Sequence, residues 1–164
     1  MANSSIIGKA KNKIIKEFIK DQQIIQAIDN TRLNPNQTEK YINTCIFDYG
    51  RNPYTEDTVD TFITVQVHIP ETWFRTKPFV KPQVEIWIIS HQRHMKVDNI
   101  PKIKVNRNDY LSELIDDKLN GRNDFGIGEL NMIANIEGEF QQNFMYRKMV
   151  FEGTDINNSM CKDE

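Results

Sequence analysis

The chain has 164 residues, of which 38 % are apolar and 27 % are charged, and its 21 basic and 23 acidic residues give a formal net charge of −2. This length corresponds to one domain with a core of its own. The near-neutral charge disfavours a protein that coats nucleic acid or an anionic membrane, because both partners require a strongly basic surface. A membrane-spanning helix needs about 20 apolar residues, and the apolar runs of this chain are far shorter, so we expect no membrane span.

The N-terminus and the cysteines lack the patterns of a secreted, disulfide-bonded protein. Residues 1–5 contain no basic stretch that leads into an apolar segment, which is the pattern of a secretory signal. We therefore expect synthesis in the cytoplasm. Cys45 and Cys161 lie far apart and belong to no Cys-x-x-Cys or Cys/His ligand spacing, so we expect free thiols.

The N-terminal segment is predicted to form an amphipathic helix. Apolar residues recur at spacings of three, four and seven over residues 4–30, and Ser4 or Ser5 can cap the start of the helix. The polar residues 20–22 can divide this helix into two, with Asp21 as the cap of the second part. A proline-containing loop follows at residues 31–37, because proline prevents continuation of a helix.

The middle of the chain changes from helical to strand periodicity. Residues 41–47 are predicted to form a short strand, and residues 59–70 alternate apolar and polar side chains as a half-buried strand does. Residues 84–91 are almost continuously apolar, which indicates a central strand covered by a helix on at least one side. Between them, the aromatic and proline-bounded segment 72–82 is expected to pack on the body or on a neighbouring subunit.

The C-terminal half is predicted to contain a second helix and two more strands. Asn108 and Asp109 can cap a helix over residues 110–119, and Asn120 with Gly121 supplies a left-handed stop. A strand over residues 127–136 follows, then a hairpin connection over residues 137–143, and then a last strand over residues 144–153.

These elements predict an α+β fold. We expect a mixed or antiparallel sheet of about four to five strands, flanked by the N-terminal helix and the second helix. The sequence shows no internal repeat and no low-complexity segment. We therefore predict a single domain over residues 1–158, followed by a C-terminal tail over residues 159–164.

The spacing of two histidines, His91 and His94, is the one pattern in the sequence that suggests catalysis. Two histidines three residues apart on a helix share a face and can bind one metal ion. His91 and His94 follow a predicted strand instead, where side chains three apart point to opposite faces. A metal-dependent hydrolase that uses His91, His94 and Asp98 stays open as an alternative. No Gly-x-Ser-x-Gly nucleophile motif is present, and we expect a protein that is not an enzyme and that has no cofactor and no metal site.

Three segments carry a resemblance to a known family. Residues 109–121 form an isoleucine- and leucine-containing helix that ends in Asn-Gly, residues 126–130 open a strand with Gly-Glu-Leu, and residues 146–157 run from Tyr-Arg into Thr-Asp-Ile-Asn. In this order the chain resembles small neck proteins of long-tailed bacteriophages, and in particular the tail-terminator, or tail-completion, family. The resemblance spans residues 84–158, whereas residues 72–82 have no counterpart in it.

The resemblance implies a structural protein of the virion, located in the neck or tail and assembled in the host cytoplasm. Such a protein assembles as a homo-oligomeric ring, a hexamer, that caps the finished tail tube and faces the head–tail connector or stopper protein. The tail tube protein is then the second partner, and DNA passes through the ring without sequence-specific binding. Two other neck rings stay open as alternatives, namely the head–tail adaptor and the stopper that closes the head.

The assembly hypothesis also suggests where contacts lie. A ring needs heterologous interfaces, and the five lysines of the first helix with three acidic residues near the C-terminus could supply complementary charge. The simpler interpretation is that both are solvated faces. Aromatic side chains dominate the binding energy of many interfaces, although those in segment 72–82 could equally form a small satellite core. We predict six contact residues: Trp73, Phe74, Arg75, Lys77, Phe79 and Arg147.

Overall fold

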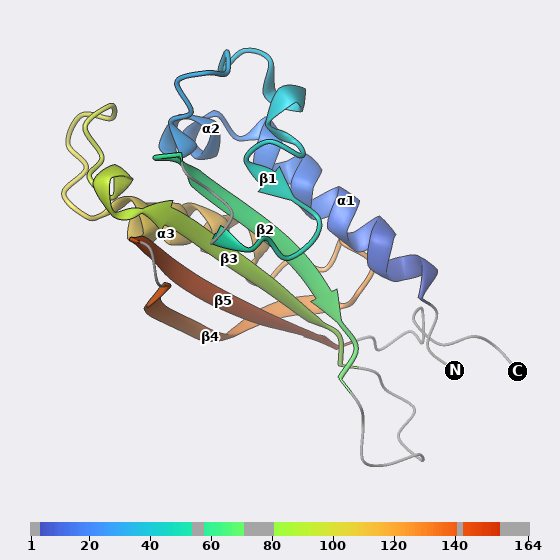
Figure 1. The fold of residues 1–164 in the computed structure, drawn as a ribbon. Coiled ribbons are helices and arrows are strands. Elements are labelled where there is room, and N and C mark those ends of the chain that lie inside the picture. The colour runs from blue at the N-terminus through green and yellow to red at the C-terminus, as the bar shows by residue number, and fades with distance from the viewer. Residues whose placement is uncertain (1–3, 54–57, 71–80, 141–142, 155–164) are drawn as a thin grey trace, which may run out of the picture.

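The computed structural model describes residues 4–53, 58–70, 81–140 and 143–154, which form a mixed five-stranded sheet with three helices (Figure 1). The predicted α+β architecture is thereby confirmed. The sheet has the order β1-β2-β3-β5-β4, in which β1 runs parallel to β2 and every other neighbouring pair is antiparallel. The strands are β1 (Ile46–Phe47), β2 (Thr61–His68), β3 (Gln83–His91), β4 (Glu129–Phe140) and β5 (Phe144–Thr154). Within the described residues, no helix is long and apolar enough to cross a membrane.

The N-terminal helix is divided at the predicted position. Helix α1 (Ser5–Lys20) and helix α2 (Gln22–Ile28) meet at Asp21, whose carboxylate accepts hydrogen bonds from the next turn, including one of 2.8 Å from the Gln23 N–H. Ser4 occupies the N-cap position of α1 but makes no capping hydrogen bond through its side chain. The expected serine cap is therefore wrong, whereas the aspartate cap is confirmed.

The predicted strand over residues 41–47 is largely replaced by a turn. A short 3-10 helix (Thr38–Tyr41) comes first, and the Cys45 N–H donates to the Tyr41 carbonyl at 2.9 Å. Asn43 adopts a left-handed conformation with φ 60°. This turn uses the backbone groups that a strand would need, so only the two residues of β1 pair with β2. Cys45 is a buried free thiol, and Cys161 lies outside the described residues.

Helix α3 (Arg107–Leu119) begins earlier than predicted. Its N-cap is Asn106, whose side chain accepts a hydrogen bond of 2.9 Å from the Asp109 N–H. The expected caps therefore lie inside the first turn, and the buried Asn108 amide accepts from Ser90 Oγ at 2.6 Å and donates to the Met145 carbonyl at 3.2 Å. The predicted stop is confirmed, since Gly121 has φ 76° directly after the last helical turn.

Strands β4 and β5 form a longer hairpin than predicted. Strand β4 extends four residues past the expected end, and the register shifts between Met132 and Ala134, so that Ile133 forms a bulge. Gly138, which resembled a turn residue, pairs with Tyr146 inside the ladder. The Tyr146 ring lies over Gly138, where a Cβ atom would collide with it. The aromatic ring compensates for the missing side chain and allows the strand to continue.

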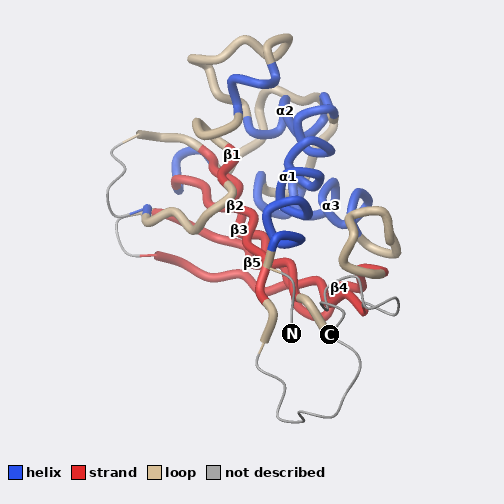
Figure 2. Tube along the Cα trace, turned by 90° about the vertical axis from the view of Figure 1, so that its right-hand side faces the viewer, coloured by secondary structure: helices blue, strands red, loops and turns tan. Residues whose placement is uncertain are grey.

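The helices cover only one face of the sheet (Figure 2). Helices α1, α2 and α3 pack their apolar sides on this face, and the strand residues of the resulting core include Ile63, Val65, Val84, Ile86, Ile88, Met149 and Phe151. The opposite face bears a second cluster, which we call the aromatic face: Phe47, Phe62, Trp87, Ile89, Phe140, Phe144 and Tyr146. No helix of the described chain lies over it. Four residues of this face, Phe47, Phe62, Ile89 and Phe144, are buried, and Trp87, Phe140 and Tyr146 are half-buried. The central strand β3 thus has one face under helices and one that no described helix covers.

Candidate assembly surface

The aromatic face is built by cross-strand pairs. The ladder places Trp87 of β3 between Thr64 of β2 and Lys148 of β5, and it places Phe140 of β4 opposite Phe144 of β5. The Trp87 ring lies 4.9 Å from the Tyr146 ring and 5.8 Å from the Phe140 ring, measured between centroids. Aromatic pairs at such distances stabilise a sheet beyond the area that they bury. The rings therefore form a fixed platform across the strands.

Charged side chains hold Trp87 in its orientation. Its indole N–H donates to Glu85 Oε1 at 2.5 Å, and Lys148 Nζ lies 3.0 Å from Glu85 Oε2. The same ammonium group lies 5.1 Å from the centroid of the Trp87 ring, within the range of a cation–π interaction. The indole is thus fixed at its polar edge while part of its apolar surface stays accessible.

A groove of about 320 Å³ runs beside Trp87 on this face. Its lining includes Phe140, Arg51, Gln66 and Thr64, and the Arg51 guanidinium lies 4.5 Å from the centroid of the Phe47 ring. The Thr64 hydroxyl is buried and has no hydrogen-bond partner among the described residues. A buried hydroxyl without a partner is unfavourable. The groove therefore combines aromatic walls with the polar side chains of Arg51 and Gln66.

The predicted contact residue Arg147 lies on the other face of the sheet. Its Nε donates to Asp109 Oδ1 at 2.9 Å, its Nη1 donates to Asn135 Oδ1 at 3.0 Å, and its Nη2 lies 3.2 Å from Glu137 Oε2. Its side chain is 16 % exposed and lines a separate groove at the start of α3. Arg147 thus joins α3 to the β4–β5 hairpin, and its role in a contact stays a prediction. The other predicted contacts lie outside the described residues: Trp73, Phe74, Arg75, Lys77 and Phe79.

The two histidines of the metal hypothesis point to different partners. His91 Nδ1 accepts from the Arg93 N–H at 3.1 Å, and Asp98 pairs with Lys96 at 2.8 Å. His94 Nδ1 lies 2.8 Å from Thr61 Oγ1. Among the described residues, no group of three His, Cys, Asp or Glu side chains could hold a metal ion. The arrangement that a metal-dependent hydrolase would need from His91, His94 and Asp98 is therefore not formed.

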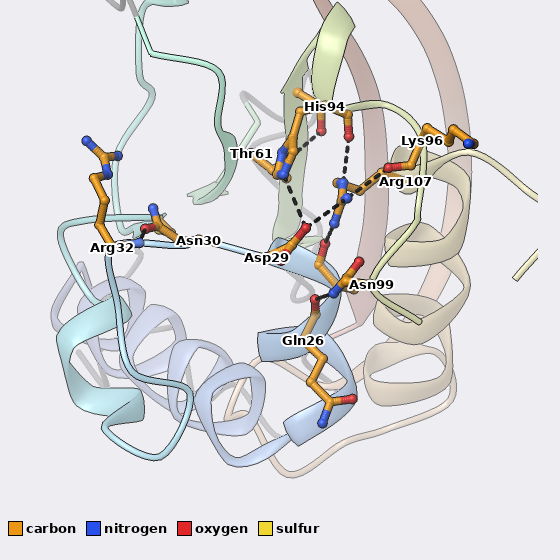
Figure 3. Close-up of polar contacts among 12 residues, drawn as sticks. Gln26, Asp29, Asn30, Arg32, Thr61, His94, Lys96, Asn99 and Arg107 are labelled. Atoms are coloured by element: carbon orange, nitrogen blue, oxygen red, sulfur yellow. Dashed lines mark hydrogen bonds and ion pairs between the residues drawn. The ribbon is translucent and has the colours of Figure 1, made fainter. Parts of the chain in front are cut away.

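A buried arginine connects the elements around His94 (Figure 3). Arg107 is 1 % exposed and donates from Nε to the His94 carbonyl at 2.6 Å and from Nη1 to the Ala27 carbonyl at 2.5 Å. Its Nη2 donates to the Lys96 carbonyl at 2.9 Å and lies 3.3 Å from Asp29 Oδ2. The guanidinium therefore ties the end of α2, the loop after β3 and the start of α3 together.

Arg107 was not among the residues that the sequence patterns single out, although one signal pointed to it. A cation in the first turn of a helix is unfavourable, because the exposed N–H groups there carry partial positive charge. Arg107 directly follows the Asn106 cap. A residue that opposes the helix dipole in this way requires tertiary partners, and the structure supplies three carbonyl groups and one carboxylate.

We expect His94 to make stability dependent on pH. Burial and the neighbouring Arg107 lower its pKa below the ordinary value of 6.5, although Asp29 and Asp60 act in the opposite direction. The unfolded chain then binds the proton more readily than the folded protein, so the free energy of unfolding falls as the pH drops from 6.5 towards the lower folded-state value. Urea unfolding of the wild-type protein and of His94→Gln at a series of pH values measures this. Equal slopes for both proteins would contradict it.

The described chain is thus an α+β protein whose sheet carries helices on one face and an aromatic platform on the other. The YomW family model matches residues 15–152, and the chain belongs to this family, which is a family of phage-derived proteins. This finding supports the phage origin that the sequence resemblance implies. No curated protein and no solved structure matches the chain.

Proposed function

We propose that the protein is a structural component of the phage neck, namely the tail terminator, which forms a ring that caps the tail tube and joins it to the head connector. The observation that carries this proposal is the aromatic face, a platform of rings that no helix of the described chain covers. Trp87, Phe140 and Tyr146 of this face are half-buried, so part of their apolar surface stays accessible. Accessible apolar surface bordered by polar groups is typical of sites that bind other proteins. The phage-derived family provides the biological context.

The chemistry of the aromatic face favours a protein partner. Trp87, Tyr146 and Arg51 are of the three residue types that most often dominate the binding energy of protein interfaces. Glu85 and Lys148 neutralise each other at its centre, so the face lacks the strongly basic character that a nucleic-acid platform requires. The partners in this proposal are the tail tube protein and the connector or stopper protein, with no cofactor and no membrane.

Two other neck rings would also need a docking platform. A head–tail adaptor binds the connector at the head, and a stopper closes the head after packaging, whereas a terminator binds the end of the tail tube. The three roles therefore differ in the partner and not in the kind of surface. Binding of the purified protein to tail tubes and to emptied heads in separate assays distinguishes them.

Replacing Trp87 by alanine is expected to weaken binding to purified tail tubes by about tenfold or more, which is the effect of removing an interface hot spot. Co-sedimentation with tubes over a range of protein concentrations measures the affinity. Val105→Ala is the matched control, because Val105 is an exposed apolar residue that lies in the loop before α3. Circular dichroism verifies that both variants fold.

Two results would refute this proposal. The first is a wild-type protein that binds neither tail tubes nor heads. The second is a folded Trp87→Ala variant that binds them as tightly as the wild-type protein does. Binding to heads alone would replace the terminator role with that of an adaptor or stopper.

A further inference from the structure

A chain of buried polar side chains leads from the start of α3 to His94. Thr61 of β2, Ser90 of β3 and Met145 of β5 are neighbours in the ladder. Ser90 Oγ lies 2.8 Å from Thr61 Oγ1, which lies 2.8 Å from His94 Nδ1. Thr61 and Ser90 are at most 1 % exposed, and Asn108 of α3 is 3 % exposed. Groups buried in this way have to satisfy one another, and we call Asn108, Ser90 and Thr61 the buried chain.

The backbone carbonyl of Met145 determines the direction of these hydrogen bonds. A carbonyl can only accept, so it accepts from the amide nitrogen of Asn108, at 3.2 Å. The amide oxygen of Asn108 then faces Ser90 Oγ at 2.6 Å, and Ser90 has to donate its single hydroxyl proton to it. The opposite orientation of the amide would bring its oxygen against the Met145 carbonyl oxygen, and neither atom has a proton to donate.

The direction is the same at each following group. Because Ser90 donates its proton to Asn108, its oxygen accepts from the Thr61 hydroxyl. Thr61 then has no further proton, so its oxygen accepts from Nδ1 of His94. Nδ1 therefore carries a proton. A neutral imidazole carries only one ring proton, so Nε2 of the neutral His94 ring is bare.

The bare Nε2 atom faces a carboxylate. It lies 3.6 Å from Oδ2 of Asp29, the C-cap residue of α2, and Arg107 Nη2 lies 3.3 Å from the same oxygen (Figure 3). Two acceptors cannot form a hydrogen bond with each other, so the neutral His94 ring donates nothing to Asp29. A proton on Nε2 supplies the missing donor and converts this contact into a charge-assisted one.

We propose that the buried chain fixes neutral His94 in the tautomer that carries its proton on Nδ1, so that Nε2 is the atom that takes up a further proton. The added proton lies between the ring and Asp29. It joins the loop after β3 to the end of α2 by an ion pair, and Asp29 then has two cationic partners, His94 and Arg107. His94 is thereby a proton-binding site whose orientation is set by hydroxyl groups of the sheet.

Charged groups from several elements face this ring. Burial, and then Arg107 of α3, hold the pKa of His94 below its ordinary value of 6.5. Asp29 at the end of α2 and Asp60 before β2 act in the opposite direction. Asp60 is itself paired with Arg32, as Asp29 is with Arg107. The neutral ring is therefore the form that the folded protein holds at neutral pH.

NMR of the protein with isotope-labelled histidine measures the tautomer directly. A ring nitrogen that carries a proton resonates far from a bare one, and comparison with His94→Gln identifies the signals of His94. Well above pH 6.5 we expect the Nδ1–H tautomer as the major form. The Nε2–H tautomer, or an equal mixture of the two, would overturn the proposal. The wild-type spectrum alone decides this point, even if a buried substitution unfolds the chain.

Ser90→Ala tests whether the tautomer is set through the buried chain. In this variant Thr61 loses its acceptor and can donate to Nδ1, so we expect the major tautomer of His94 to reverse to Nε2–H, although Thr61 lies between the mutated residue and the ring. Ser112→Ala is the matched control, because it removes another serine hydroxyl of α3, which donates to the Asp109 carbonyl at 2.8 Å. It should keep the wild-type tautomer. A folded Ser90→Ala variant with the Nδ1–H form would contradict the role of the chain.

Asp29→Asn tests where the further proton is bound. Residue 29 has φ 52°, a left-handed conformation that asparagine adopts readily, so the variant removes the charge and keeps the turn. We expect His94 to titrate at a lower pH than in the wild-type protein, because the carboxylate next to Nε2 favours the charged ring. Asp98→Asn is the control of equal charge change, since Asp98 pairs with the exposed Lys96 in the same loop.

Equal titration of His94 in the Asp29→Asn and Asp98→Asn variants would show that the proton does not lie beside Asp29, and it would overturn the proposed ion pair. Circular dichroism verifies that each variant folds. None of these results bears on the proposed neck role, which is measured through the binding of tail tubes and its dependence on Trp87.

Discussion

Replacing Arg107 by alanine is expected to lower the free energy of unfolding by about 3–5 kcal/mol, because the change leaves the partners of a buried charged group without a donor. The Ala27, His94 and Lys96 carbonyls lose their hydrogen bonds in the variant, and Asp29 loses its closest cation. The end of α2, which is distant in the sequence, also loses its link to the loop after β3 and to the start of α3. Urea denaturation followed by circular dichroism measures the difference.

Two variants separate the geometry of Arg107 from its charge. Arg107→Lys keeps the charge but has a single nitrogen in place of the guanidinium fork, so we expect it to recover only part of the lost stability. Arg93→Ala removes an exposed arginine of the same loop region and should change the free energy of unfolding by less than about 0.5 kcal/mol. Similar effects for Arg107→Ala and Arg93→Ala would show that the buried network contributes nothing.

The elements that could be predicted from the sequence are those that a local pattern determines. The helical spacing of apolar residues in the first segment predicts α1 and α2 with the break at Asp21. The alternation of apolar and polar residues predicts β2. The predicted strand over residues 41–47 is wrong for most of its length. The hydrogen bond between the Cys45 N–H and the Tyr41 carbonyl stabilises a turn there, and this outweighs the strand propensity of the apolar residues. The long β4 was missed because Gly138 resembles a turn residue until Tyr146 is seen to lie over it.

The candidate site could be predicted only in part. Alternation in β5 placed Phe144, Tyr146 and Lys148 on one face, and the structure confirms this placement. No local pattern in the sequence indicates that β5 lies between β3 and β4. The contacts of the Trp87 ring with Tyr146 and Phe140 could therefore not be predicted. The near-continuous apolar character of β3 predicts a central strand with a helix on at least one side, and the structure confirms both. Strand order is a property of tertiary pairing, which a single sequence does not display.

Replacing Gly128 by alanine is the second change with a large expected effect. Gly128 has φ 79°, and a Cβ atom there would collide with the backbone carbonyl of Thr154 at the end of β5. The left-handed conformation costs a residue with a side chain about 1–2 kcal/mol, and forcing the two strands apart adds about 1–3 kcal/mol or more. Because backbone cannot rotate away as a side chain can, the start of β4 or the end of β5 has to move. We therefore expect a clear fall in the urea midpoint.

Gly126→Ala provides the matched control for this change. Gly126 has φ 84°, and a Cβ atom there would find no other atom within 4 Å, so its replacement tests the conformational cost without the collision. The difference between the free energies of unfolding of the two variants then isolates the close approach of Gly128 to β5. A Gly128→Ala variant no less stable than Gly126→Ala would mean that the strands separate there at little cost. With the expected difference, the approach at Gly128 fixes where the β4–β5 ladder begins, and thereby the register of the whole hairpin.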